Sequence, residues 1–346
     1  MSDRLGIGVL GLHEGHTLLI GLRASGLCRA VAGCDLSSAK RAQALESTPE
    51  LFVTESYEEM LGRHDVRIVA IYTPDAHHAA HIEQAFLAGK DVICTKPLVN
   101  DLSVANRLKE LAVQTGRRLQ VGQSTRFGEP FQRQREHFEE GRLGELEVVD
   151  AHYNHRMDWL YEKSPWSISE THWAYLGLSH PIDLVTWYLG PIREVHAFGT
   201  ITALGTRYRL ETPDAITVNL MGESGRIGRV LGNYGFHELP KARSLIECQL
   251  MGSKGTSIAR YPELRFTYTD GVKEQDEDYE HSMTGYYSRH ELKGMHYGEF
   301  CNYADYFASK LLSGEPNSPD LTEGLETVAV MDAVVRSLQE GRSVSI

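Results

Sequence analysis

Apolar positions follow two different patterns along the 346-residue chain. As far as about residue 122, short runs rich in Val, Ile and Ala alternate with longer amphipathic segments. The runs lie at 5–11, 29–34, 66–72, 91–95 and 117–122. Helical spacing occupies 77–89 and 101–116, the latter between Asp101 and Gly116. Continuous apolar strands separated by helix-length segments indicate a parallel sheet covered on both faces. The pattern predicts a doubly wound α/β domain over residues 1–125.

After about residue 128 the apolar positions tend to alternate instead. Helical segments are predicted at 129–144 and 171–190, and again at 297–314 and 321–341. Period-2 runs lie at 145–155, 195–204, 214–222, 228–236 and 244–252. Such runs with few helices between them predict an open, mostly antiparallel sheet. We therefore expect a second α/β domain over 126–346, with its final helices able to pack back on the first domain.

Composition narrows the function classes. A net charge of −12 speaks against wrapping nucleic acid or lying on an anionic membrane, since both favour dense Lys/Arg faces. No apolar stretch approaches the roughly 20 residues of a membrane span, and the first residues lack a signal-peptide pattern. The five cysteines are scattered and form no Cys-x-x-Cys pair, which favours free thiols. We expect a cytoplasmic protein that binds neither nucleic acid nor membrane.

A glycine-containing loop follows the first predicted strand. Against the pattern Gly-x-Gly-x-x-Gly, Gly11 fits, whereas His13 and His16 stand at the second and third glycine positions and Gly15 is one place early. Glycine at a strand–helix turn also has a purely structural explanation. The loop alone leaves both interpretations open.

Asp35 strengthens the nucleotide interpretation. It follows the second strand, 24 residues after Gly11, near the interval expected for the carboxylate that binds a ribose diol. The alternative is that Asp35 caps a helix starting at Leu36 or Ser37. A carboxylate here repels a 2′-phosphate, so we predict NAD, with NADP left open by nearby Ser38 and Lys40.

Two further strand ends carry the most specific motifs. Thr73-Pro74-Asp75 with His77-His78 follows the third long strand, and Thr95-Lys96-Pro97 follows the next. Together with VAGCD, GRLGELEVVDAHY and GLSHPIDLVTWYLG, these motifs resemble the Gfo/Idh/MocA family of glucose–fructose oxidoreductase and inositol dehydrogenase. The resemblance runs nearly end to end. It implies a Rossmann domain, a second domain with a large open sheet, and a homodimer or homotetramer formed through that sheet.

The resemblance also implies roles for individual residues. To the cofactor contacts Gly11, His13, Gly15 and Asp35 that the fingerprint pattern suggests, it adds Thr73, Pro74, His78, Lys96 and Gln123. It assigns the reaction to Lys96, His180 and Asp183, the last two on one helix face. It leaves Arg126, His155, Asp158, Trp166, His172 and Tyr234 as candidate substrate contacts. His78 could equally be a packing residue, and His180 a core histidine bonded to Asp183.

This sequence departs from the family pattern at two places in the second domain. Leu176 stands where relatives have an acid four residues before the histidine, so the acid would have to come from elsewhere. Candidates are Asp158, Glu170 and His172, the last expected one turn before Leu176 on the same helix face. A tryptophan–arginine pair is also incomplete, because Ser167 follows Trp166.

The preferred hypothesis is NAD(P)-dependent hydride transfer at a secondary alcohol of a sugar, sugar derivative or cyclitol. Aromatic residues Tyr153, Trp159, Tyr161, Trp173, Tyr234 and Phe236 could form a sugar-stacking wall or be ordinary core. Two alternatives stay open: an NAD-dependent glycoside hydrolase of the same fold that oxidises C3 transiently, and a non-catalytic NAD-sensing regulator. No metal-ligand spacing is present, so we expect no metal.

Overall fold

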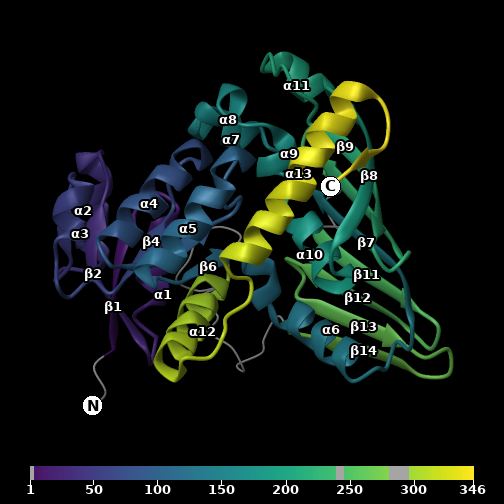
Figure 1. The fold of residues 1–346 in the computed structure, drawn as a ribbon, viewed down its shortest axis with the longest axis horizontal. Coiled ribbons are helices and arrows are strands. Elements are labelled where there is room, and N and C mark those ends of the chain that lie inside the picture. Colours follow the sequence, from purple (N-terminus) through teal and green to yellow (C-terminus); the bar gives the residue numbers. More distant parts are fainter. Residues whose placement is uncertain (1–3, 239–244, 280–295) are drawn as a thin grey trace. The chain divides into compact units, whose positions relative to one another are not determined.

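The computed structural model describes residues 4–238, 245–279 and 296–346 (Figure 1). The chain divides into two compact units, Met1–Ser124 with Met283–Leu325 and Thr125–Ser282 with Glu326–Ile346. The predicted boundary between residues 125 and 126 and the predicted packing of the final helices stay predictions. Within the described residues, no helix is both long and apolar enough to cross a bilayer.

The first unit is built on a six-stranded parallel sheet in the order β3-β2-β1-β4-β5-β6. Its strands are β1 (Leu5–Leu10), β2 (Cys28–Cys34), β3 (Phe52–Thr54), β4 (Ile68–Ile71), β5 (Asp91–Thr95) and β6 (Leu119–Gly122). Every residue of β4 is buried, as expected for an apolar run inside a covered sheet. The predicted doubly wound fold is confirmed, and its strand order is that of dinucleotide-binding sheets.

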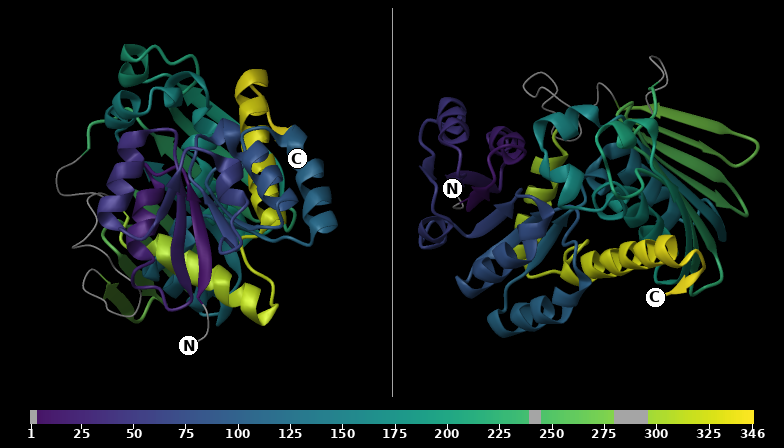
Figure 2. Two further views of the ribbon diagram at one scale, coloured as in Figure 1. Left: turned by 90° about the vertical axis from the view of Figure 1, so that its left-hand side faces the viewer. Right: turned by 90° about the horizontal axis from the view of Figure 1, so that it is seen from above.

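Helices lie on both faces of this sheet (Figure 2). They are α1 (Gly15–Gly21), α2 (Ser38–Ser47), α3 (Tyr57–Leu61), α4 (His78–Leu87), α5 (Ala105–Thr115) and α12 (Glu299–Ser313), with short 3-10 turns at Asp75–His77 and Leu102–Val104. The predicted stop of α5 is confirmed, because Gly116 takes a left-handed conformation with φ of 63°. The far downstream helix α12 contacts α1 and β6.

The second unit contains a nine-stranded sheet in the order β14-β13-β12-β11-β7-β10-β9-β8-β15. Its strands are β7 (Leu146–Asn154), β8 (Ile192–Thr200), β9 (Ala215–Gly222), β10 (Ile227–Asn233), β11 (Ile246–Gly252), β12 (Thr256–Tyr261), β13 (Arg265–Thr269), β14 (Glu274–Asp278) and β15 (Val344–Ser345). All neighbours are antiparallel except β7 and β10. The predicted mostly antiparallel sheet is confirmed.

Two helices, α6 (Glu129–Glu139) and α10 (Ser179–Leu189), pack on this sheet. The other helices are α7 (Asp158–Lys163), α8 (Trp166–Ser169), α9 (Trp173–Leu176), α11 (Ala203–Arg207) and α13 (Leu321–Glu340), with a 3-10 turn η3 at Ser124–Phe127. On β9 the alternate residues Ile216, Val218 and Leu220 are buried, which gives the period-2 pattern seen in the sequence.

The prediction of a single helix over 171–190 is wrong, because two separate helices occupy this range. Helix α9 ends at Leu176, and α10 begins at Ser179 after Gly177 and Leu178. His172 precedes α9 as its N-cap residue. The three positions 172, 176 and 180 therefore do not form one face of a continuous helix.

Candidate active site

In the first unit, five predicted residues follow the carboxyl ends of five strands. Gly11 follows β1, Asp35 follows β2, Thr73 lies two residues after β4, Lys96 follows β5 and Gln123 follows β6. Because the strands are parallel, these ends lie at one edge of the sheet, where ligands of open α/β sheets bind.

The loop after β1 needs glycine at two places. Gly11 has φ of +88°, and a Cβ there would lie 2.7 Å from the backbone oxygen of Tyr72. A Cβ at Gly15 would lie 2.5 Å from Cγ1 of Val9. The backbone at both glycines passes so close to neighbouring residues that a side chain would clash, which is a structural reason for glycine. Both glycines also belong to the loop at the sheet edge where ligands of this fold class bind.

Asp35 holds this loop in place. Its Oδ2 accepts a hydrogen bond of 2.8 Å from the backbone N–H of Leu12, and its Oδ1 accepts one of 2.8 Å from that of Ser37. Ser37, not Asp35, is the N-cap residue of α2, so the helix-cap alternative is wrong. The partly exposed carboxylate keeps lone pairs that can accept hydrogen bonds from the hydroxyl groups of an NAD ribose.

Sequence reasoning missed His296, which contacts this loop from just before α12. Its Nε2 lies 3.0 Å from Oε1 of Glu14, and its Nδ1 lies 2.6 Å from Oε1 of Glu299. Burial lowers the pKa of His296, but the two carboxylates overcome this effect and raise it to about 10. An imidazolium therefore offsets part of the negative charge that Glu14 places at the loop. No spacing in the sequence signals this contact.

Lys96 lies half-buried at the same edge. Burial lowers the pKa of its ammonium group to about 8, against the opposing influence of Glu14 and Asp75. A lysine that stays charged at neutral pH but loses its charge near pH 8 suits a site where charge develops during a reaction. This is the most functionally specific feature of the first unit.

His78 connects two strand-end loops. Its Nε2 lies 2.8 Å from the carbonyl oxygen of Thr73, and its Nδ1 lies 2.9 Å from that of Pro97. Burial lowers the pKa of this imidazole. The contacts support the packing interpretation of His78, which holds the loop containing Pro74 beside the lysine loop.

In the second unit, His180 lies near the start of α10 and is 5% exposed. Its Nδ1 lies 3.1 Å from Oγ1 of Thr125, a residue of the turn η3. The ring of Tyr153 meets the imidazole edge-on, with 5.9 Å between centroids. Thr125 is a second residue that sequence reasoning missed.

The adjacent residue of η3, Arg126, pairs with Asp183. Its Nε donates to Oδ2 at 2.7 Å, and its Nη2 donates to Oδ1 at 2.8 Å. The two side chains are 4% and 2% exposed, and the guanidinium lies 4.9 Å from the ring centroid of Trp187. The residue pattern predicts that Asp183 orients His180 or binds a neighbouring hydroxyl, and in the structure its carboxylate accepts these two hydrogen bonds from Arg126.

Three members of the expected aromatic wall are core residues. Tyr161, Trp173 and Tyr234 are between 0% and 2% exposed, and the last two stack with centroids 4.4 Å apart. Their polar atoms have no hydrogen-bond partner among the described residues, so they fit ordered water or ligand hydroxyls. Half-buried Tyr153 and exposed Trp159 remain as stacking faces.

The candidate replacements for the acid at Leu176 have other structural roles. Asp158 accepts a hydrogen bond of 2.8 Å from Nε of Arg156. Nδ1 of His172 accepts the backbone N–H of Ala174 at 2.9 Å, and burial lowers the pKa of His172 to about 4. Glu170 is exposed at the end of α8.

Two predicted substrate contacts remain, His155 directly after β7 and Trp166 at the start of α8. Nε2 of His155 accepts a hydrogen bond of 3.1 Å from the indole of Trp159, and burial lowers the pKa of His155. Trp166 begins α8 and is half-buried. His13, a predicted cofactor contact in the loop after β1, is also half-buried.

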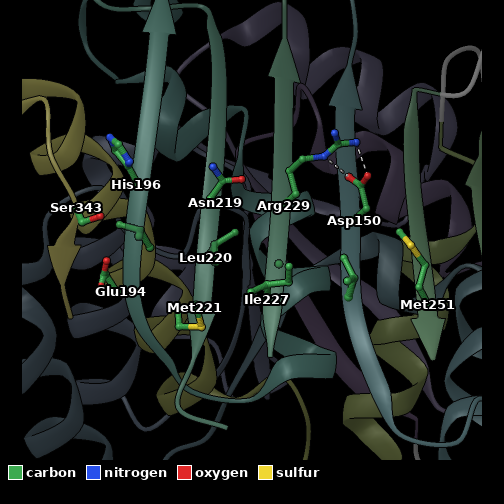
Figure 3. A pocket seen from close by; sticks show the side chains of 13 residues that line it. Asp150, Glu194, His196, Asn219, Leu220, Met221, Ile227, Arg229, Met251 and Ser343 are labelled. Atoms are coloured by element: carbon green, nitrogen blue, oxygen red, sulfur yellow. Dashed lines mark hydrogen bonds and ion pairs between the residues drawn. The ribbon is translucent and has the colours of Figure 1, made fainter. Parts of the chain in front are cut away.

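Figure 3 shows side chains that line a hollow on the outer face of the nine-stranded sheet, the face that carries Asp150, His196 and Arg229. Asp150, Glu194, His196, Asn219 and Arg229 contribute side chains to it, and none is a predicted site residue. Arg229 Nε donates to Oδ1 of Asp150 at 3.1 Å. In the described part of the chain, no three His, Cys, Asp or Glu residues are grouped so as to hold a metal ion.

Comparisons with known proteins agree with this architecture. The model of an oxidoreductase family with an NAD-binding Rossmann fold matches residues 5–123, and that of the same family's C-terminal α/β domain matches 135–346. An inositol 2-dehydrogenase of Gluconacetobacter diazotrophicus is 31% identical over 54% of this chain and 54% of its own length. One of Rubrobacter xylanophilus is 25% identical over 98% and 92%. A levoglucosan dehydrogenase solved with NADH and levoglucosan has a TM-score of 0.85 at 17% identity, covering 99% of this chain and 100% of that one.

Proposed function

The chain belongs to the Gfo/Idh/MocA oxidoreductase family, and on that premise we propose that it transfers a hydride between NAD and a secondary alcohol of a sugar, sugar derivative or cyclitol. The observation that carries the proposal is the convergence of Gly11, Asp35 and Lys96 at one edge of an NAD-binding sheet. The names of the relatives, an inositol dehydrogenase and a levoglucosan dehydrogenase, support the substrate class.

Two side chains are proposed as reacting groups. Bound NAD⁺ would supply the hydride acceptor, C4 of the nicotinamide. We assign His180 to accept the hydroxyl proton as the alcohol is oxidised, because imidazole takes and returns a proton near neutral pH. The ammonium group of Lys96 would donate a hydrogen bond to the substrate oxygen as negative charge develops there. The proton on His180 then passes to water, and the carbonyl product leaves.

The contacts of Asp183 and Asp35 support one proposed role for each residue. With its carboxylate held by Arg126, Asp183 is proposed as a positioning residue. Asp35 would bind the ribose diol and disfavour a 2′-phosphate, so we propose NAD as the preferred cofactor.

A screen for NADH formation across inositols, sugars and glycosides tests the proposal. Lys96→Met and His180→Asn should each lower kcat by about a hundredfold or more, the usual loss of an acid–base or charge-stabilising group, while binding of NAD is kept. Thermal shifts with NAD and NADP provide the binding control. Absence of both turnover and nucleotide stabilisation would favour the sensing alternative. Release of an aglycone without net NADH would favour the hydrolase.

We also propose that the outer face of the nine-stranded sheet joins copies of the chain, as the family resemblance implies. Phe198 and Ile227 are 63% and 46% exposed on this face, and Ile227 borders the hollow in Figure 3. Exposed apolar side chains of this size favour contact with another surface. Light scattering that shows a monomer at micromolar concentration would contradict this proposal.

A further inference from the structure

One hydrogen-bond partner of His180 comes from outside its own helix. In this chain the position four residues earlier is Leu176, which ends α9 before α10 begins. The contact is made instead by Thr125, whose Oγ1 lies 3.1 Å from Nδ1 of the imidazole. Both residues are 5% exposed, so water does not compete freely for this bond. The buried hydroxyl of Thr125 and the buried imidazole of His180 therefore satisfy each other's hydrogen-bonding capacity at Oγ1 and Nδ1.

The neighbouring ion pair fixes the distance between these two groups. Consecutive residues 125 and 126 of η3 contact His180 and Asp183, which lie three residues apart on α10. A bidentate pair between a guanidinium and a carboxylate fixes orientation as well as distance. Because the pair is buried, separating the two charges would raise the free energy strongly, since neither charge could be solvated by water. The turn is thus fastened to the helix at two adjacent points.

We propose that Thr125 is a positioning residue that takes the place of the acid absent at Leu176, holding Nδ1 of His180 so that Nε2 exchanges the substrate proton. The inference rests on the proposed function of His180. A hydroxyl oxygen has two lone pairs, so it accepts the Nδ1–H of both the neutral imidazole and the imidazolium. The ring therefore keeps one orientation while its other nitrogen gains and loses a proton.

The hydroxyl also differs from a carboxylate in charge. A carboxylate partner orients a catalytic histidine and stabilises its imidazolium form. Thr125 supplies the orientation without the negative charge. An imidazolium held by a hydroxyl is less stabilised than one held by a carboxylate, which makes release of its proton easier.

Three variants separate positioning from mere packing. Thr125→Val keeps the shape and removes the hydroxyl, whereas Thr125→Ser keeps the hydroxyl. Thr186→Val is the matched control, because Oγ1 of Thr186 donates to a backbone carbonyl of its own helix at 3.0 Å. We expect Thr125→Val to lower kcat about ten- to a hundredfold, the size of effect that misplacement of a reacting group produces, with NAD affinity within about twofold of wild type. Thr125→Ser should stay within about threefold, and Thr186→Val should be unchanged.

Nitrogen NMR of His180 tests the same inference without turnover. The wild-type protein should show the Nδ1–H tautomer, and Thr125→Val should shift the ring toward the Nε2–H tautomer. An Nε2–H tautomer in wild type, or an unchanged kcat in Thr125→Val, would overturn the inference. If no alcohol is oxidised at all, the proposed function fails, and the tautomer alone decides the role of Thr125. If Thr125→Val does not fold, the smaller Thr125→Ala takes its place in both measurements.

Discussion

The buried pair between Arg126 and Asp183 makes the sharpest prediction about stability. Replacing Arg126 with Met leaves the carboxylate of Asp183, 2% exposed, without its bidentate partner. Removing one member of a buried ion pair costs about 3–5 kcal/mol, because the remaining charge stays away from water. Loss of the guanidinium from the face of Trp187, at 4.9 Å, adds about 0.5–1 kcal/mol. We expect the free energy of unfolding to fall by about 4 kcal/mol.

Tryptophan fluorescence can follow this loss in the second unit alone. All four tryptophans of the chain lie in that unit: Trp159, Trp166, Trp173 and Trp187. Urea unfolding monitored by fluorescence should therefore report the stability of that unit. For a domain of its size, about 4 kcal/mol corresponds to a fall in Tm of about 8–16 °C.

Two controls make the measurement decisive. The double variant Arg126→Met with Asp183→Leu removes both charges and should recover most of the loss, since apolar replacement of a buried pair is often neutral. The exposed pair of Arg226 and Glu145, 37% and 82% exposed, should contribute less than about 1 kcal/mol when Arg226 is changed to Met. A loss under about 1 kcal/mol in Arg126→Met, or additive losses in the double variant, would refute the reasoning.

Three further predictions follow from other contacts. Because burial lowers the pKa of Lys96 to about 8, kcat/KM of wild type should fall as pH rises through about 8, and pH–rate profiles of Lys96→Met should lack that limb. Burial lowers the pKa of His296, but its two glutamates raise it from 6.5 to about 10, so its stabilising contribution is complete below about pH 6.5 and disappears as pH rises through about 10. The Tm difference between wild type and His296→Gln should shrink over that range, and a constant difference would contradict the ion pairs. Gly177→Ala places a Cβ 2.3 Å from Cζ of Tyr234, so urea unfolding should show a loss of about 1–3 kcal/mol, whereas unchanged stability would mean that the ring moves aside.

The elements that could be predicted from the sequence are those whose burial leaves a periodic pattern. The strand β4 is buried at every residue, and α5 ends at a left-handed glycine, so both are evident in the residues themselves. The three-residue strand β3 is too short to show a period. The strand β14 contains no apolar residue, so its conformation comes from pairing with β13. Pairing between strands is not encoded in the composition of one strand.

The same distinction applies to the candidate site. Asp35 and Lys96 could be found because each follows a strand, and the ends of parallel strands share an edge. The contact between Thr125 and His180 joins residues 55 apart, and its geometry depends on how η3 meets α10. The expected line of His172 with His180 failed because the chain leaves the helical path between Leu176 and Ser179. Contacts made through space leave no trace in local periodicity.

The two hydrogen bonds accepted by Asp35 have a consequence for redesign of cofactor preference. Asp35, which we propose discriminates between the two nicotinamide cofactors, also accepts hydrogen bonds from Leu12 in the glycine loop and from Ser37 at the start of α2. A substitution of Asp35 that allows a 2′-phosphate to bind would remove the hydrogen bonds to Leu12 and to Ser37 together. A change of cofactor preference to NADP therefore requires redesign of the glycine loop and of the start of α2. A single substitution of Asp35 by a neutral or basic residue should lower the affinity for both NAD and NADP.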